Sequence, residues 1–198
     1  MSHSRRYNKL KSRIKALELH FLPQPKLSGN YTVKETDFTK AYVILVHAEI
    51  ETYFEEVAKH KAQVTLAKWR SDRRKSNCLL SVMSFMTPEI QWENDDHKNC
   101  LEYRINKSVS HYISILDRNN GIKANNIFSM LLPLGIEERE LDPTWLIDMD
   151  SFGGARGNFA HSSHSVQLQI DPTTEKDRIN NQILPIIANV DTLIRKLW

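Results

Sequence analysis

One segment of the sequence, RGNFAH from Arg156 to His161, carries two side chains suited to phosphate chemistry. Arginine is a permanent cation, and histidine exchanges a proton near neutral pH. Five residues of helix turn the chain by about 140° and advance it by about 7.5 Å, so the two Cα atoms are not stacked, but a long arginine side chain still reaches an anion beside the histidine. Cleavage of RNA without a metal needs a group that moves protons and a cation that stabilises phosphate charge. Arg156 and His161 are therefore either a candidate catalytic pair or two side chains that share this spacing on a helix by chance.

Three further side chains are candidates for supporting this pair. Asn158 carries an amide that either hydrogen-bonds a phosphate or His161, or caps and packs the helix. Glu49 and Glu51 lie on another predicted helix, where each either orients His161 or faces solvent as most glutamates on long helices do. His161 and His164, three residues apart, also resemble a pair of metal ligands. No third ligand stands near them in the sequence, so we expect no metal and no cofactor.

The familiar motifs of nucleotide-binding and zinc enzymes are missing from the sequence. It contains no GxxxxGK[ST] loop, no GxGxxG turn after a strand and no HExxH helix. Two cysteines are too few for a disulfide framework, which favours a reducing compartment. The N-terminus does not resemble a secretory signal, and no apolar run approaches the roughly 18 residues of a membrane span. We therefore expect a cytoplasmic protein with no membrane partner.

Length and composition predict one globular domain over residues 1–198. The 198 residues are 40% hydrophobic and 26% charged, which is close to the average of globular proteins. The net charge is only +3, but basic residues gather in two runs, over residues 5–15 and 68–75. Such runs either form a face for phosphate backbones or only solvate the surfaces of helices.

Hydrophobic spacing predicts the elements of the N-terminal half. A basic amphipathic helix is predicted over residues 1–22, followed by a surface loop over residues 23–36 that contains prolines and glycine. Thr36 or Asp37 is predicted to cap a long second helix that runs to about Lys75. The first half of this helix is nearly all apolar, which indicates a buried position.

The rest of the sequence predicts further helices over residues 101–116, 127–132, 143–163 and 173–197, and an apolar segment over residues 78–86 that Pro88 ends. Residues 119–121 have the types suited to a left-handed end of the helix before them, and Pro133 ends the next helix. Each of the last two helices starts with an Asp-Pro pair, and Pro185 is predicted to kink the final one. The predicted fold is all-α, an up-and-down helical bundle with elaborated loops.

The segment RGNFAH resembles the RxxxxH motif of HEPN-domain ribonucleases, in the variant with alanine before histidine found in the RiboL-PSP-like and MAE-type HEPN families. The segment AYVILVHAEIETYFEEVAK, over residues 41–59, is similar to the second-helix segment of the same families, because an apolar half precedes a glutamate-bearing half. The resemblance extends from about residue 36 to residue 198. One position departs from the motif: the family commonly has a polar residue directly after the arginine, whereas Gly157 stands there and Asn158 follows.

This resemblance implies a metal-independent endoribonuclease whose substrate is RNA. It assigns His161 to the 2′-hydroxyl as base or to the leaving 5′-oxygen as acid, and Arg156 to the charged phosphorane, with a 2′,3′-cyclic phosphate as product. HEPN domains commonly pair so that two motifs face one cleft, which implies a homodimer because one histidine is not both base and acid in the same step. Such proteins resemble toxins of toxin–antitoxin or antiviral defence systems, so an antitoxin protein is a candidate partner. The alternative is a catalytically inactive HEPN-like dimeric binding or scaffold module.

Overall fold

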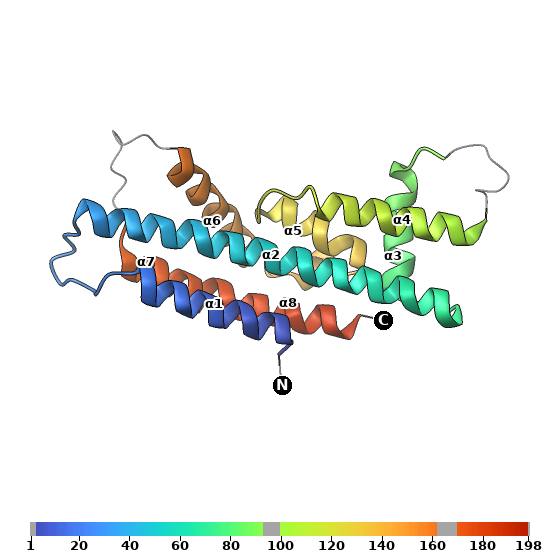
Figure 1. The fold of residues 1–198 in the computed structure, drawn as a ribbon, viewed down its shortest axis with the longest axis horizontal. Helices are drawn as coiled ribbons and strands as arrows, with labels where there is room; N and C mark the ends of the chain where they lie inside the picture. The colour runs from blue at the N-terminus through green and yellow to red at the C-terminus, as the bar shows by residue number, and fades with distance from the viewer. Residues whose placement is uncertain (1–2, 93–99, 162–169, 198) are drawn as a thin grey trace. The chain divides into compact units, whose positions relative to one another are not determined.

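The computed structural model describes residues 3–92, 100–161 and 170–197, and these residues form helices with no strand among them (Figure 1). The all-α class predicted from the sequence is confirmed. The chain divides into two compact units, which we describe separately. The first unit holds residues 1–53, 121–124 and 141–192, and the second holds residues 54–120, 125–140 and 193–198. The prediction of one domain over residues 1–198 stays a prediction.

The first unit is built from helices of the N-terminal and C-terminal parts of the chain. Its elements are α1 (Arg5–Phe21), the first part of α2 (Val33–Asp72), α6 (Pro143–His161), α7 (Pro172–Asp177), a π-helical segment (Arg178–Ile183) and most of α8 (Leu184–Lys196). The rings of Tyr7 and Tyr53 lie 6.3 Å apart, and those of Phe21 and Phe38 also lie 6.3 Å apart. The start of α1 thus meets the later part of this α2 segment, so the two helices are antiparallel.

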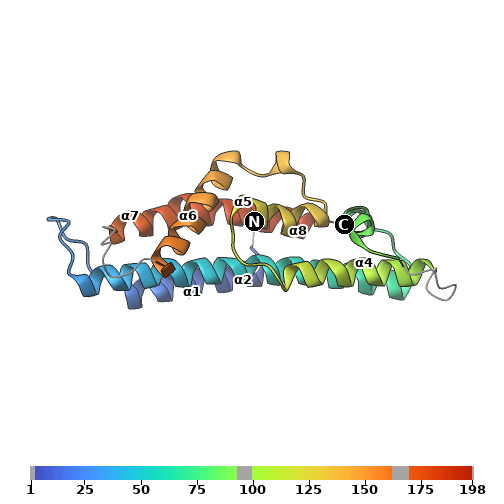
Figure 2. The same cartoon turned by 90° about the horizontal axis from the view of Figure 1, so that it is seen from above.

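The elements α7, the π-helical segment and α8 form one nearly continuous helix (Figure 2). It runs antiparallel to α1, because the Asn180 amide donates to Glu18 Oε1 at 2.6 Å and the Tyr7 hydroxyl donates to the Leu184 carbonyl at 3.0 Å. Pro185 has no N–H for the carbonyl four residues earlier, and the π-helical segment ends two residues before it. The structure thus shows a change of helix type just upstream of Pro185, and the kink predicted at this proline stays a prediction.

The basic amphipathic helix predicted over residues 1–22 is confirmed as α1. Ser4 caps its start, because the Ser4 Oγ accepts the N–H of Tyr7 at 3.0 Å. The apolar stripe is buried and consists of Tyr7, Leu10, Ile14 and Leu17. Most of the basic side chains are exposed on the opposite side. The helix ends at Phe21, shortly before Pro23, since proline disfavours helical geometry in the residue that precedes it.

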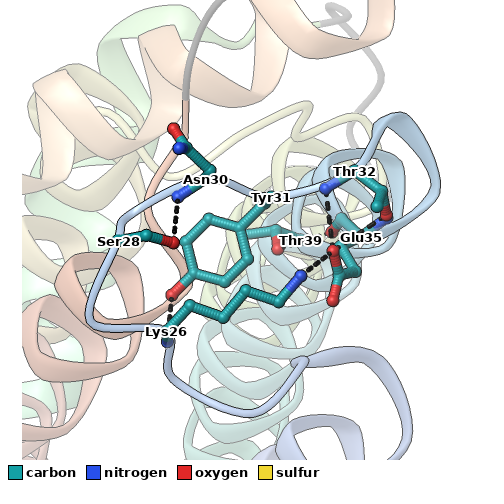
Figure 3. Close-up of polar contacts among 7 residues, drawn as sticks. All are labelled: Lys26, Ser28, Asn30, Tyr31, Thr32, Glu35 and Thr39. Atoms are coloured by element: carbon teal, nitrogen blue, oxygen red, sulfur yellow. Dashed lines mark hydrogen bonds and ion pairs between the residues drawn. The ribbon is translucent and has the colours of Figure 1, made fainter.

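The start of α2 corrects the sequence prediction. The helix begins at Val33 rather than near Thr36, so the loop predicted over residues 23–36 ends at residue 32. Thr32 Oγ1 accepts the N–H of Glu35 at 3.3 Å, while Glu35 Oε2 accepts the N–H of Thr32 at 2.7 Å (Figure 3). This reciprocal capping box satisfies two backbone N–H groups at the start of the helix. Its Thr-x-x-Glu spacing is visible in the sequence, so this start was predictable.

The loop before α2 is tied to the helix through Lys26. The Lys26 ammonium lies 2.6 Å from Glu35 Oε2, and the Lys26 backbone N–H donates to the Tyr31 hydroxyl at 3.2 Å (Figure 3). The hydrogen bond from Lys26, followed by those from Thr32, lowers the pKa of Glu35 to about 2. The capping carboxylate is therefore ionised at any physiological pH.

The second unit is built on the rest of α2. Its other α-helices are α3 (Asn77–Met86), α4 (Leu101–Leu116) and α5 (Ala124–Leu131). Its 3₁₀ helices are Thr87–Glu89, Leu132–Leu134 and Glu138–Glu140. Arg70 Nη2 donates to Asn106 Oδ1 at 2.7 Å, and Lys59 Nζ donates to Asp117 Oδ1 at 2.7 Å, so α2 and α4 are antiparallel. Across the described residues of both units, no helix has the length and apolar character needed to cross a membrane.

Three predicted helix ends in the second unit need correction. The helix α2 ends before Arg73, whose φ of 56° is left-handed, rather than near Lys75. The helix α4 ends before residues 119–121, so these do not form its left-handed end; Gly121, with a φ of 137°, lies in the following loop. Pro133 does not end α5 directly but lies inside the 3₁₀ helix that continues it.

A buried carboxylate joins three parts of the first unit. Asp191 on α8 is 2% exposed and accepts the N–H of Ser4 at 2.9 Å and the Tyr53 hydroxyl at 2.9 Å. The Ser4 hydroxyl donates to the same carboxylate. Asp191 thereby connects the N-terminus of α1 and the middle of α2 to α8. Buried polar groups need hydrogen-bond partners, so these three hydrogen bonds stabilise the first unit.

Replacing Asp191 with alanine is expected to lower the free energy of unfolding by about 3 kcal/mol, because buried donors lose their acceptor. Chemical denaturation of both forms measures the difference. The exposed Asp37, whose ion pair among the described residues is with Lys40 at 3.6 Å on the same helix, gives the matched control. Asp37→Ala is expected to change stability by less than about 0.5 kcal/mol. Equal losses in the two variants would contradict the role of Asp191.

Candidate active site

The predicted catalytic pair lies on α6. Asp142 caps this helix as predicted from the Asp-Pro pair, and its Oδ1 accepts two backbone N–H groups of the first turn at 2.8 and 3.1 Å. The helix passes through Arg156 and ends at His161. The backbones of both candidates therefore belong to one helix. The side chains of His161 and His164, and the helix end predicted at residue 163, lie outside the described residues.

The buried face of α6 ends one turn before Arg156. Trp145, Met149 and Phe152 are buried at steps of four and three residues, which is the spacing of one helix face. Arg156 follows Phe152 by four residues and is half-buried, whereas Asn158 is exposed. The helix thus packs through Phe152 and places Arg156 at the edge of the packed face. The role predicted for Asn158 stays a prediction.

A histidine that the sequence analysis did not select lies beside Arg156. His47 on α2 is 2% exposed, and its ring stacks on that of Phe152 with centroids 6.1 Å apart and planes at 30°. Burial, and after it the positive charge of Arg156, lowers the pKa of His47 from 6.5 to about 4. A neutral imidazole therefore adjoins the candidate catalytic arginine at physiological pH.

The two glutamates predicted to support the pair lie in different surroundings. Glu51 is on the His47 face of α2, with its Oε2 3.6 Å from His47 Nδ1. Glu49 instead accepts a hydrogen bond from Arg13 of α1 at 2.8 Å. The structure therefore brings Glu51, His47 and Arg156 into one cluster, while Glu49 binds α1. A direct role of either glutamate on His161 stays a prediction.

The Phe152 ring also meets Arg178, the first residue of the π-helical segment. The Arg178 guanidinium carbon lies 5.4 Å from the centre of the Phe152 ring, and Arg178 Nη2 donates to the Asp148 carbonyl of α6 at 3.2 Å. Phe152 therefore contacts both an imidazole from α2 and a guanidinium from the C-terminal helix. These contacts fix α6 immediately before Arg156.

The glycines of α6 serve different purposes. A Cβ on Gly153 would lie 2.9 Å from Lys123 Cγ, so this glycine allows the loop before α5, over residues 119–123, to approach α6. Gly154 and Gly157 have no described atom within 4 Å of such a Cβ, so nothing described there requires glycine.

The depressed pKa of His47 predicts a loss of stability in mild acid. Because the folded-state pKa of about 4 lies below the unfolded value of 6.5, the unfolded chain binds the extra proton between these pH values. The stabilisation is complete above pH 6.5 and falls by about 3 kcal/mol as the pH drops to 4. Denaturation of wild type and His47→Leu across this range measures it. The wild type should lose stability more steeply, and identical slopes would contradict the assignment.

Comparison with known protein families gives a match over nearly the whole chain. The sequence model of the RiboL-PSP-HEPN family matches residues 8–196, which is nearly the whole chain. No curated protein and no solved structure matches it. The match includes α6 with Arg156 and His161 and the part of α2 that carries His47. It indicates a nuclease-type or RNA-related role.

Proposed function

Because the chain belongs to the RiboL-PSP-HEPN family, we propose that it is a metal-independent endoribonuclease with Arg156 and His161 as its catalytic residues. The observation that carries the proposal is the position of the pair on one helix, with the half-buried Arg156 held beside a packed face. At the edge of the packed face of α6, the aliphatic part of an arginine side chain packs against its neighbours while the guanidinium is accessible to solvent. This arrangement suits an anionic phosphodiester.

The proposed reaction is an internal transfer at phosphorus. The 2′-oxygen of a ribose attacks the adjacent phosphate and forms a bond to phosphorus, while the bond to the leaving 5′-oxygen breaks. A base accepts the 2′-hydroxyl proton, and an acid supplies a proton to the 5′-oxygen, so the products are a 2′,3′-cyclic phosphate and a 5′-hydroxyl. His161 performs one of these transfers, and Arg156 stabilises the extra charge on the phosphorane.

The need for two proton transfers favours a homodimer. A single imidazole is either base or acid when the reaction starts, so His161 of a second copy supplies the other role. A twofold dimer places the same residues of both copies around one axis. In this proposal the protein acts in the cytoplasm as a toxin or phage-defence effector. An antitoxin protein is its proposed inhibitor.

One observation favours an alternative function. Gly157 stands directly after Arg156, where the family commonly has a polar residue, and no described atom lies within 4 Å of a Cβ placed on it. Without a polar side chain at this position, the site has one hydrogen-bonding group fewer with which to bind the phosphate. The alternative is therefore a catalytically inactive HEPN-like dimeric module that binds or scaffolds its partners.

Incubation of the purified protein with single-stranded RNA in excess EDTA tests the proposal. The nuclease is expected to cut under these conditions and to leave 2′,3′-cyclic phosphate ends, which mass spectrometry identifies. Absence of cleavage supports the scaffold alternative. Cleavage that EDTA abolishes would contradict a metal-independent mechanism and direct attention to a metal at His161 and His164.

A further inference from the structure

His47 is an unusual residue for the interior of the first unit. It lies on α2 between apolar neighbours, is 2% exposed, and its Nδ1 has no hydrogen-bond partner among the described residues. Burial of a polar atom without a bond is unfavourable, so an apolar residue of similar size would fit this position better on packing grounds alone. Local departures of this kind are expected where a residue serves a site.

The surroundings of His47 connect it to Arg156. Its ring stacks on Phe152, which precedes Arg156 by one turn of α6. Arg156 thus lies one helical turn from the residue that the imidazole contacts, and its positive charge is the second cause, after burial, of the lowered pKa of His47. On the other side, Glu51 Oε2 lies 3.6 Å from His47 Nδ1. An imidazole that carries its proton on Nδ1 toward Glu51 keeps the lone pair of Nε2 as an acceptor for a guanidinium N–H.

We propose that His47 is a positioning residue for Arg156: its neutral imidazole, oriented by Glu51, accepts a hydrogen bond from the guanidinium and directs it toward the phosphate. This inference rests on the proposed nuclease function. A carboxylate behind an imidazole fixes the tautomer and makes the other nitrogen a better acceptor. The separation of 3.6 Å between Nδ1 and Oε2 exceeds a hydrogen bond, and catalytic contacts are often long in the free enzyme and shorten when substrate binds.

Three variants and one double variant test this role in the RNA cleavage assay. His47→Leu removes both nitrogen atoms and places an apolar side chain in the same buried position. His47→Gln keeps a donor and an acceptor. In the proposed reaction Arg156 stabilises the negative charge of the phosphorane, so a misplaced guanidinium affects the transition state more than substrate binding. His47→Leu is therefore expected to lower kcat by about 10- to 100-fold with little change in KM. His47→Gln is expected to recover much of the lost kcat. The double variant His47→Leu/Arg156→Ala is expected to be no slower than Arg156→Ala alone.

A matched packing control separates positioning from folding. Val43 is fully buried on the same helix, and its side chain has no hydrogen-bonding group. Val43→Ala is expected to lower thermal stability and to leave kcat unchanged below its melting transition. Should His47→Leu fail to fold, Glu51→Gln carries the same test, since it leaves His47 in place and is expected to lower kcat only when Arg156 is present.

The outcomes distinguish the inference from the function on which it rests. If the wild type cuts RNA and Arg156→Ala does not, but His47→Leu and Glu51→Gln cut like the wild type, the inference alone is overturned. It is also overturned if the losses from His47→Leu and Arg156→Ala multiply in the double variant. If the wild type and Arg156→Ala cut equally, or neither cuts, the proposed function fails first and the inference fails with it.

Discussion

The His161→Ala variant is expected to lower kcat/KM for RNA cleavage by about 10⁴-fold. A positioned acid or base contributes about 10²–10⁴ to a rate, and a homodimer loses both when both copies lack the imidazole. The expected loss is therefore at the upper end of the range for one residue. Single-turnover cleavage of an end-labelled RNA, with protein in excess, measures it without interference from product release.

A histidine elsewhere in the chain provides the control for this experiment. His111 on α4 lies 3.2 Å from Glu89 through its Nε2 and belongs to the second unit. His111→Ala is expected to cut RNA at the wild-type rate. If His161→Ala retains the wild-type rate, His161 is not the group that moves the proton and the catalytic assignment is wrong.

Replacing Arg156 with alanine is the second large effect that we expect, about 10²–10³-fold in kcat. Removal of one group that stabilises transition-state charge has an effect of this size. Arg156→Lys is expected to lie between alanine and wild type, because a compact ammonium keeps the charge but lacks the planar set of donors. The same single-turnover assay, repeated over a range of protein concentration, separates kcat from binding.

An exposed arginine of the second unit controls for the loss of a positive charge. Arg118 follows α4, and its Nε donates only to the Ser114 carbonyl at 3.0 Å in the described contacts. Arg118→Ala is expected to behave like the wild type. A loss in Arg156→Ala confined to KM would show that Arg156 binds RNA without stabilising the transition state.

The sequence predicts most helices because the signals that define them are local. The apolar stripe of α1 and the Asp-Pro pairs before α6 and α7 each specify an element within a few neighbouring residues. The signal for the start of α2 is equally local, since Thr32 and Glu35 have capping-box spacing. Thr36 and Asp37, whose side chains also suit a cap, were predicted there instead. The π-helical segment depends on the absent N–H of Pro185 and on the packing of the last helix, which spacing alone does not reveal.

The candidate site was only partly predictable for a physical reason. Arg156 and His161 are close in sequence, so their shared helix follows from local pattern. His47 contacts α6 from another helix, and only tertiary packing shows that Phe152 and Arg156 lie beside it. Helix geometry does carry one usable signal. Glu49 and Glu51 are about 200° apart around α2 and so point to different surroundings, whereas residues four apart, such as His47 and Glu51, share a face.

In the proposed reaction this chain breaks RNA through attack by the 2′-oxygen. His161 transfers a proton, and Arg156 stabilises the charge on the phosphorane. The most direct test of this reaction is a set of RNA oligonucleotides that each carry one 2′-deoxynucleotide at a site where the wild type cuts. The account predicts that cleavage stops at the substituted nucleotide and continues at the other sites in the same molecule. Cleavage at the substituted nucleotide at an undiminished rate would contradict it, because no 2′-oxygen is present there to attack.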